Sequence, residues 1–216
     1  MSLALETLKT SYLRAQLAGD RREAVRVVVE EGLRTASILE VLEHVIAAAQ
    51  DEIGRMWQQN RVSIAQEHMA TAISQLSLAA LFERSQASPP IGKKVLIACV
   101  EGELHELPAR LVSDVLELAG FTVRHLGANV PTEHLIMMVQ AEKPDLIGLS
   151  VTMSFNVTAL QDAVTRLRGF TQAPIVVGGH ALTWATRLAA ELGVHTAGKK
   201  PEELVAVARR LTGVAA

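Results

Sequence analysis

The stretch VLIACVEGELHELPARL, residues 95–111, contains a change of pattern that decides the fold of its half of the chain. It begins with six consecutive apolar residues, a length and composition typical of a buried strand. A polar loop that contains Glu103 and His105 follows, and an apolar helical pattern resumes from Ala109. This order predicts the start of an α/β unit whose first loop carries polar side chains.

The same alternation continues to the end of the chain. Four further apolar runs, near residues 122–126, 146–151, 175–177 and 194–196, predict strands. Helical patterns lie between them, near residues 109–119, 132–142, 158–168 and 182–192, and a last helix begins at Pro201. We therefore expect a flavodoxin-like (Rossmann-type) domain over residues 94–216, with a five-stranded parallel sheet covered by helices on both faces. Ligands of such sheets bind outside the carboxyl ends of the strands.

The preceding half of the chain has helical periodicity throughout. Four helices are expected, near residues 3–17, 21–33, 37–58 and 64–84. Ser63 and Gln66 have the spacing of a capping box at the start of the fourth helix. We expect a four-helix bundle over residues 1–85. The segment at residues 85–94, with two prolines and one glycine, is interpreted as a linker.

Composition limits the classes of function. The chain has 216 residues, 49% of them hydrophobic, and a formal net charge of −2, so direct nucleic-acid binding is not expected. Cys99 is the one cysteine and lies in an apolar run, which favours a buried hydrophobe over a reactive thiol. No signal peptide and no membrane-spanning run of about 20 apolar residues is recognisable, and we expect a cytoplasmic protein that does not bind membranes.

Glu103 and His105 follow the first strand, and the pair has two interpretations. A histidine in a loop is often only a solvated polar residue. A carboxylate beside an imidazole, however, fixes the ring when its other nitrogen binds a metal. The sequence HELPA from His105 lacks the second histidine of a zinc protease, and no G-x-G-x-x-G follows the strand. The loop therefore indicates one metal ligand, His105, and not a cage of protein ligands.

Residues after several strands resemble the signatures of cobalamin-binding domains, D-x-H-x-x-G, S-x-L/T and GG. The loop at residues 126–131 is also similar to the one after the second strand of these domains. The residues that carry the resemblance are Glu103, His105, Gly127, Asn129, Ser150, Thr152, Gly178 and Gly179.

This resemblance implies that His105 is the lower ligand of cobalt and that the displaced dimethylbenzimidazole tail enters a cleft beside the sheet. Ser150 offers the tail a hydrogen bond, and the two glycines offer it a wall without side chains. Two departures stand out: Glu103 replaces the aspartate of the signature, and Pro108 replaces its glycine.

The helical half resembles the module that precedes the cobalamin domain in methyltransferase corrinoid proteins and in light-sensing regulators of the CarH type. Trp57 with Glu67 and His68 matches the W-x9-E-H signature of the photoreceptors. In that family these residues cover a 5'-deoxyadenosyl group above the cobalt. Taken alone, Trp57 and His68 are more typical of core residues beside apolar stripes, and Glu67 of a solvated helix residue. Gln58 occupies the position of a histidine that ligates cobalt in the photoreceptors after illumination.

The resemblance favours a light-sensing regulatory protein with adenosylcobalamin as chromophore, without the DNA-binding domain, which signals through self-association or a partner protein. The alternative is a corrinoid carrier of a methyltransferase system. A mutase subunit is disfavoured because the chain shows no barrel domain. No catalytic residue is predicted: a regulator is favoured over an enzyme, and an enzymatic role would be that of a corrinoid subunit.

Overall fold

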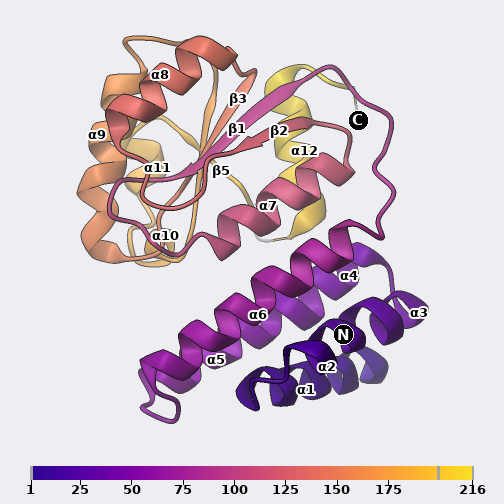
Figure 1. The fold of residues 1–216 in the computed structure, drawn as a ribbon. Coiled ribbons are helices and arrows are strands. Elements are labelled where there is room, and N and C mark those ends of the chain that lie inside the picture. The colour runs from indigo at the N-terminus through magenta and orange to yellow at the C-terminus, as the bar shows by residue number, and fades with distance from the viewer. Residues whose placement is uncertain (1, 199, 216) are drawn as a thin grey trace. The chain divides into compact units, whose positions relative to one another are not determined.

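A computed structural model of the chain describes residues 2–198 and 200–215. The chain divides after Gln86 into a helical unit and an α/β unit (Figure 1). No helix within the described ranges is long and apolar enough to cross a bilayer.

The helical unit consists of four helical segments. The first is α1 (Leu3–Leu17), and the last is α6 (Ile64–Phe82). The second comprises α2 (Arg21–Arg26), the π-helical η1 (Val27–Gly32) and α3 (Leu33–Thr35), and the third comprises α4 (Ile38–Val41), the π-helical η2 (Leu42–Ala47) and α5 (Ala48–Gln58). The expected helical module is thus confirmed, but its middle helices contain π turns. Apolar spacing shows which side faces the core, and it does not reveal the extra residue of a π turn.

Local signals explain where these helices begin. Ser63 accepts a hydrogen bond from the Gln66 N–H, and the Gln66 side chain accepts one from the Ser63 N–H, so the predicted capping box is present. Ser37 and Glu40 form a second box at the start of α4. The buried face includes Tyr12, Val28, Val45, Ile46, Ala49, Ile53, Leu78 and Leu81.

Within the described residues of the α/β unit, five strands form one parallel sheet in the order β2-β1-β3-β4-β5. The strands are β1 (Lys94–Cys99), β2 (Thr122–His125), β3 (Leu146–Ser150), β4 (Ile175–Gly178) and β5 (His195–Thr196). This is the predicted flavodoxin-like sheet. The chain moves outward from β1 to β2 and then returns to the other side of β1 with β3. The carboxyl ends of β1 and β3 therefore mark the switch point where ligands of such sheets bind.

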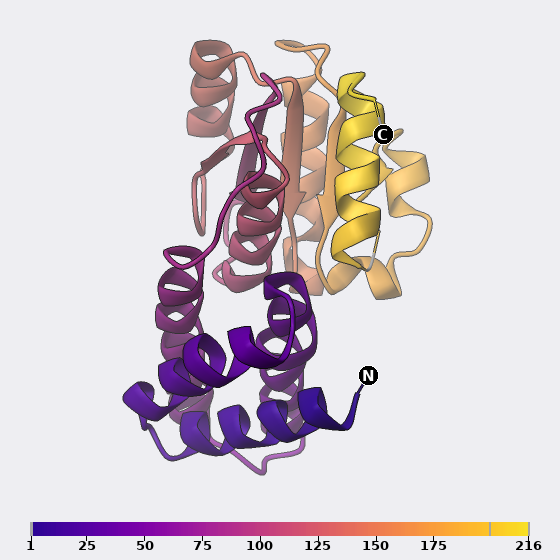
Figure 2. The same cartoon turned by 90° about the vertical axis from the view of Figure 1, so that its right-hand side faces the viewer.

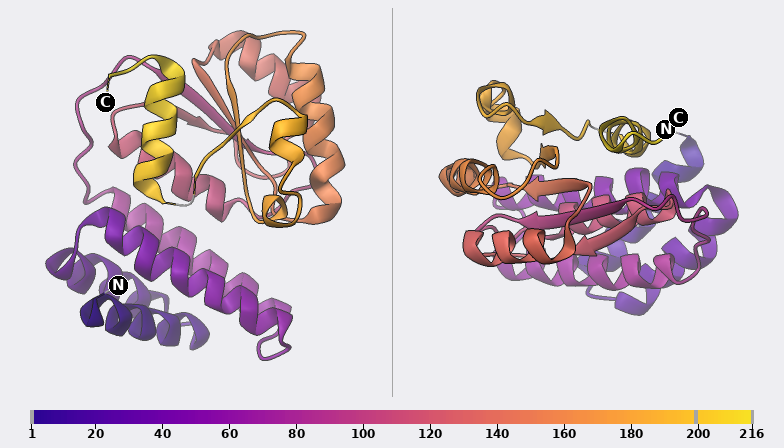
Figure 3. Two further views of the ribbon diagram at one scale, coloured as in Figure 1. Left: turned by 180° about the vertical axis from the view of Figure 1, so that it is seen from behind. Right: turned by 90° about the horizontal axis from the view of Figure 1, so that it is seen from above.

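Helices cover the two faces of the sheet (Figures 2 and 3). On one face, α8 (Thr132–Glu142) and α9 (Val157–Leu167) pack against apolar residues of the strands, with Leu135 and Leu160 fully buried. On the other face lie α7 (Leu107–Leu118) and α12 (Pro201–Thr212). Pro108 lies in the first turn of α7, where its missing N–H leaves no helical hydrogen bond unmade.

The prediction of one helix at residues 182–192 is wrong in one respect. The structure has two short helices there, α10 (Ala181–Trp184) and α11 (Leu188–Glu191), and the backbone leaves helical geometry at Ala185. The buried residues Ala181, Leu188 and Ala189 fit the spacing of one long helix as well as that of two short ones. Periodicity therefore did not predict the break.

The expected linker at residues 85–94 is not a free connection. The N–H groups of Ser88 and Ile91 donate to the carbonyls of Leu118 and Gly120, at 2.9 Å each. Gly120 has φ +93, and a Cβ on it would lie 2.5 Å from the carbonyl oxygen of Pro89. The close approach of this segment to the end of α7 therefore requires glycine.

Candidate cobalamin site

Glu103 and His105 lie in the loop after β1 and contact each other directly. Nδ1 of His105 is 2.6 Å from Oε1 of Glu103, and the backbone N–H of His105 donates to the same oxygen at 2.9 Å. An ionised carboxylate only accepts hydrogen bonds, so Nδ1 carries the hydrogen and Nε2 has the lone pair of the neutral ring. The imidazole is 46% exposed, whereas the Glu103 side chain is fully buried. The pair thus presents an oriented imidazole at the surface.

The buried carboxylate of Glu103 is held by the segment after β3. Its Oε2 accepts hydrogen bonds from the N–H groups of Thr152 (2.8 Å) and Met153 (2.9 Å) and from Nδ2 of Asn156 (3.0 Å). Burial raises the pKa of this carboxyl, but the hydrogen bonds from His105, Met153 and Asn156 outweigh burial. The pKa of Glu103 therefore lies well below its ordinary value of 4.5.

Asn156 has a part in the site that sequence reasoning missed. It is buried in the short 3-10 helix η3 (Ser154–Asn156), and its contact with Glu103 spans 53 positions of the chain. No local pattern in the sequence gives a signal for such a contact. Thr152, which was predicted as a site residue, has a buried hydroxyl with no hydrogen-bond partner among the described residues.

The loop after β2 braces the loop that carries His105. The N–H of Asn129 donates to the Glu103 carbonyl at 2.8 Å, and its side-chain oxygen accepts from the Gly102 N–H at 2.8 Å. Asn129 has φ +50 and Gly127 has φ +82. The two residues predicted in this loop therefore fix the backbone next to the Glu103–His105 pair.

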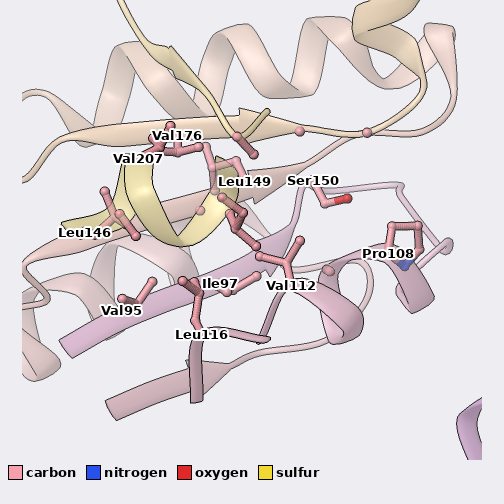
Figure 4. Close-up of a pocket in the computed structure, with 17 residues that line it drawn as sticks. Val95, Ile97, Pro108, Val112, Leu116, Leu146, Leu149, Ser150, Val176 and Val207 are labelled. Carbon is pink, nitrogen blue, oxygen red and sulfur yellow. The ribbon is translucent and has the colours of Figure 1, made fainter. Parts of the chain in front are cut away.

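An apolar cavity lies between the sheet and the helices α7 and α12, with about 530 Å³ of space between atoms, part of it open to solvent (Figure 4). Val95, Ile97, Val112, Leu149 and Val176 are among the side chains that line it. Ser150 supplies a hydroxyl at the end where Pro108 lies.

Gly178 and Gly179 contribute to the same cavity in different ways. A Cβ on Gly178 would lie 3.9 Å from the nearest heavy atom, the Cβ of Ala197, so its missing side chain leaves space open. Gly179 has φ +109, and a Cβ there would lie 2.1 Å from the Val151 carbonyl oxygen. Only glycine fits at position 179.

These features fit a cobalamin whose lower ligand comes from the protein. The apolar lining of the cavity, with one hydroxyl, suits an aromatic base with hydrogen-bonding nitrogens. No group of three or more His, Cys, Asp or Glu side chains able to hold a metal occurs in the part of the chain that the structure describes.

Cys99 is fully buried at the end of β1, as predicted. Burial, followed by the nearby charges of Glu103 and Glu106, raises the pKa of its thiol to about 12. The thiol is therefore protonated at neutral pH and is a poor metal ligand.

In the helical unit, the predicted residues Trp57, Glu67 and His68 lie on α5 and α6, close to the loop that joins these helices. Nδ1 of His68 is 2.6 Å from Oε2 of Glu67, and the His68 side chain is 71% exposed. The interpretation of His68 as a core residue beside an apolar stripe is therefore wrong. Trp57 is also an exposed side chain, with 37% exposure.

Comparison with known proteins identifies the class. A family described as "B12 binding domain" matches residues 93–208, and a second family with the same description matches residues 8–82. The chain belongs to the B12-binding family and is a cobalamin-binding protein.

The relatives in sequence fall into two groups. The HTH-type transcriptional repressor CarH of Myxococcus xanthus is 30% identical over 194 residues, 88% of this chain but 63% of its own length. This chain thus spans less than two thirds of that protein. Dimethylamine corrinoid protein 1 of Methanosarcina acetivorans is 26% identical over 197 residues, 86% of this chain and 92% of its own length. These findings support the alternative prediction, a corrinoid carrier, better than the light-sensing regulator.

Solved structures agree in fold. The monomethylamine corrinoid protein of Methanosarcina barkeri has a TM-score of 0.79 and 17% identity, with 95% of this chain and 99% of that chain covered. A chain of the methanol:cobalamin methyltransferase complex MtaBC from the same organism has a TM-score of 0.50 and 19% identity, with 96% and 80% covered. The helical unit followed by the five-stranded sheet is thus the corrinoid-protein fold.

Proposed function

We propose that this protein is a corrinoid carrier that holds cobalamin in the α/β unit and serves a partner methyltransferase. The observation that carries the proposal is the 2.6 Å contact between Glu103 and His105 at the switch point of the sheet. Relatives named as corrinoid proteins, one of them aligned over 92% of its length, support it. A solved complex of a methyltransferase with a similarly folded chain supports the kind of partner.

In this proposal each part of the site has one task. His105 would ligate cobalt through Nε2, and Glu103 would hold the ring by Nδ1. Ser150, Gly178 and the apolar cavity receive the nucleotide tail, while Gly127, Asn129 and Thr152 fix the surrounding loops. Bound cobalamin supplies a cobalt centre that accepts and releases a methyl group. No membrane or nucleic acid is required.

A second candidate function, the light-sensing regulator with adenosylcobalamin, is favoured by one specific observation. Trp57, Glu67 and His68 have the spacing of the photoreceptor signature. The relatives in sequence also include the HTH-type transcriptional repressor CarH. In this candidate the three residues contact the adenosyl group, and the signal passes through self-association or a regulatory partner. Because Gln58 is a poor cobalt ligand, we expect illumination to leave water above the cobalt.

One titration separates the two functions. The protein is loaded with methylcobalamin or adenosylcobalamin, and the affinity for each is measured by visible absorption, before and after green light. Equal affinities, with a light response no greater than that of the unbound cofactors, support the carrier. A strong preference for adenosylcobalamin, lost in Trp57→Ala, supports the sensor. A stable bis-histidine product that disappears in His68→Ala would contradict the expectation of a water-ligated light state.

A further inference from the structure

Four polar side chains are fully buried in the core of the helical unit, Tyr12, Gln16, Ser74 and Ser77, and the first three form a hydrogen-bonded cluster. The Tyr12 hydroxyl donates to Oγ of Ser74 at 3.4 Å, and Nε2 of Gln16 donates to the same oxygen at 2.8 Å and to the Ala70 carbonyl at 3.1 Å. Burying polar groups is unfavourable unless they are hydrogen-bonded. These contacts join α1 to α6 inside the unit.

The buried cluster extends to the surface through Gln50 on α5. Ser74 donates to Oε1 of Gln50 at 3.1 Å, and Nε2 of Gln50 lies 2.6 Å from Oγ1 of Thr71 and 3.3 Å from Oε1 of Glu67. Thr71 also donates to Oε1 of Glu67, at 2.9 Å. The other oxygen of Glu67 contacts Nδ1 of His68. A continuous chain of hydrogen bonds therefore runs from His68 at the surface to Tyr12 in the core.

Ser74 is the point at which this chain can rearrange. A hydroxyl donates one hydrogen bond and accepts two, and the contacts with Gln50, Gln16 and Tyr12 use all three. If the Gln50 amide turns to follow Glu67, Ser74 loses its acceptor and has to donate elsewhere. Turning the Ser74 hydroxyl toward a new acceptor also turns the lone pairs that accept from Tyr12 and Gln16.

A second partner for Tyr12 is already nearby. Burial raises the pKa of the Tyr12 phenol, and the hydroxyls of Ser74 and Ser77 lower it. The Ser77 hydroxyl is buried and has no hydrogen-bond partner among the described residues, so it is able to accept from Tyr12. The Tyr12 hydroxyl thus has two alternative acceptors one helical turn apart on α6.

We propose that occupation of the Glu67–His68 pair by a ligand changes the hydrogen bonding of Tyr12 on α1, with Gln50 as the positioning residue that connects them. The proposal rests on the assignment of Glu67 and His68 as cofactor-contacting residues, which belongs to the second candidate function. Gln50 orients the Glu67 carboxylate and transmits its displacement to Ser74. The helical unit thereby responds to the group carried on the cofactor, whether methyl, adenosyl or water.

Tyr12 is the only tyrosine in the sequence, so a signal from tyrosine reports directly on this chain of hydrogen bonds. Full-length protein with ¹³C-labelled tyrosine at Cζ is measured by NMR without cofactor and with adenosylcobalamin or hydroxocobalamin, both diamagnetic. We expect one tyrosine resonance whose position differs between the cofactor-free and loaded protein. In Gln50→Leu this difference should be lost, because leucine makes no hydrogen bond to Glu67 or Ser74. In Gln59→Leu, a matched change at an exposed glutamine directly after α5, it should persist.

Visible absorption of the same samples shows whether a negative result refutes the proposed function or only this inference. Protein that binds no cobalamin refutes the proposed function and this inference with it. Protein that binds cobalamin while the Tyr12 resonance stays constant refutes the inference alone. A cofactor-dependent shift that persists in Gln50→Leu also refutes it, because Gln50 is the connecting residue. Gln50→Met, which keeps an unbranched side chain of similar length, is the second variant if Gln50→Leu does not fold.

Discussion

The two units each carry a carboxylate–imidazole pair, and the pairs differ in how they are held. In both, a histidine Nδ1 lies 2.6 Å from a glutamate oxygen, between Glu103 and His105 in the α/β unit and between Glu67 and His68 in the helical unit. The side chain of Glu103 is fully buried, whereas that of Glu67 is 17% exposed. Their imidazoles are 46% and 71% exposed.

The hydrogen-bond partners of the two carboxylates show how the two pairs differ. Glu103 is held largely by the backbone N–H groups of Thr152 and Met153, in the segment directly after β3. Glu67 is held by the side chains of Gln50 and Thr71, which are able to rotate. In the proposed function, the α/β unit would thus offer cobalt a ligand whose carboxylate partner is held by backbone groups. The pair in the helical unit is suited to a contact that changes with the state of the cofactor.

The largest expected effect comes from a substitution that displaces the backbone segment after β3, which holds Glu103. Gly179→Ala places a Cβ against the Val151 carbonyl at a positive φ, and we expect it to lower the free energy of unfolding by about 4 kcal/mol. Gly54→Ala, in α5 with nothing within 4 Å of the new Cβ, is the control and should raise stability by about 1 kcal/mol. Urea unfolding measures both. Equal effects of the two substitutions would contradict the account of Gly179.

The next effect compares the two histidines. His105→Ala should weaken cobalamin binding about 100-fold or more, because the cobalt loses its lower protein ligand. His68→Ala should change the affinity less than tenfold, because Glu67 and His68 do not anchor the cofactor. Titration followed by visible absorption measures both variants. A larger loss in His68→Ala than in His105→Ala would reverse the assignment.

Glu103→Gln should weaken cobalamin binding by about tenfold through loss of the charged partner of His105. It should also change the dependence of stability on pH. The folded-state pKa of Glu103 is lowered, so its stabilising effect is present above pH 4.5 and is lost as pH falls below that value. The difference in unfolding free energy between the unmodified protein and Glu103→Gln should therefore shrink on acidification. A difference that grows or stays constant as pH falls from about 5 to about 3 would contradict the assigned direction.

The smallest effect is expected at the pair in the helical unit. Glu67→Gln keeps the size of the side chain and removes its charge, and we expect a change of about threefold or less in the affinity for hydroxocobalamin. Its stability cost should be below that of Glu103→Gln, because Glu67 is partly exposed. Urea unfolding and titration of both variants make the comparison. A greater stability loss in Glu67→Gln would show that the helical pair is the more rigid one.

The sequence predicted the features that depend on neighbouring residues. The apolar run before Glu103 predicted β1, the Ser63 and Gln66 spacing predicted a capping box, and the Glu103-x-His105 spacing predicted a carboxylate beside an imidazole. Contacts between distant segments carry no such signal. Asn156 and Gln50 reach their glutamates across 53 and 17 positions. The adjacent apolar stripe, taken alone, indicated a buried His68, whereas the W-x9-E-H spacing favoured a cofactor contact, and the structure exposes the side chain.

The most direct test of the central claim, that His105 ligates cobalt through Nε2, is electron paramagnetic resonance of the cobalt(II) form. Protein grown with ¹⁵N-histidine is loaded with cobalamin and reduced. We predict superhyperfine coupling from one nitrogen, changed by the ¹⁵N label, and absent as a histidine coupling in His105→Ala. Two results would contradict the account. One is a coupling that the ¹⁵N label does not change, as expected for the dimethylbenzimidazole nitrogen. The other is a histidine coupling that is retained in His105→Ala.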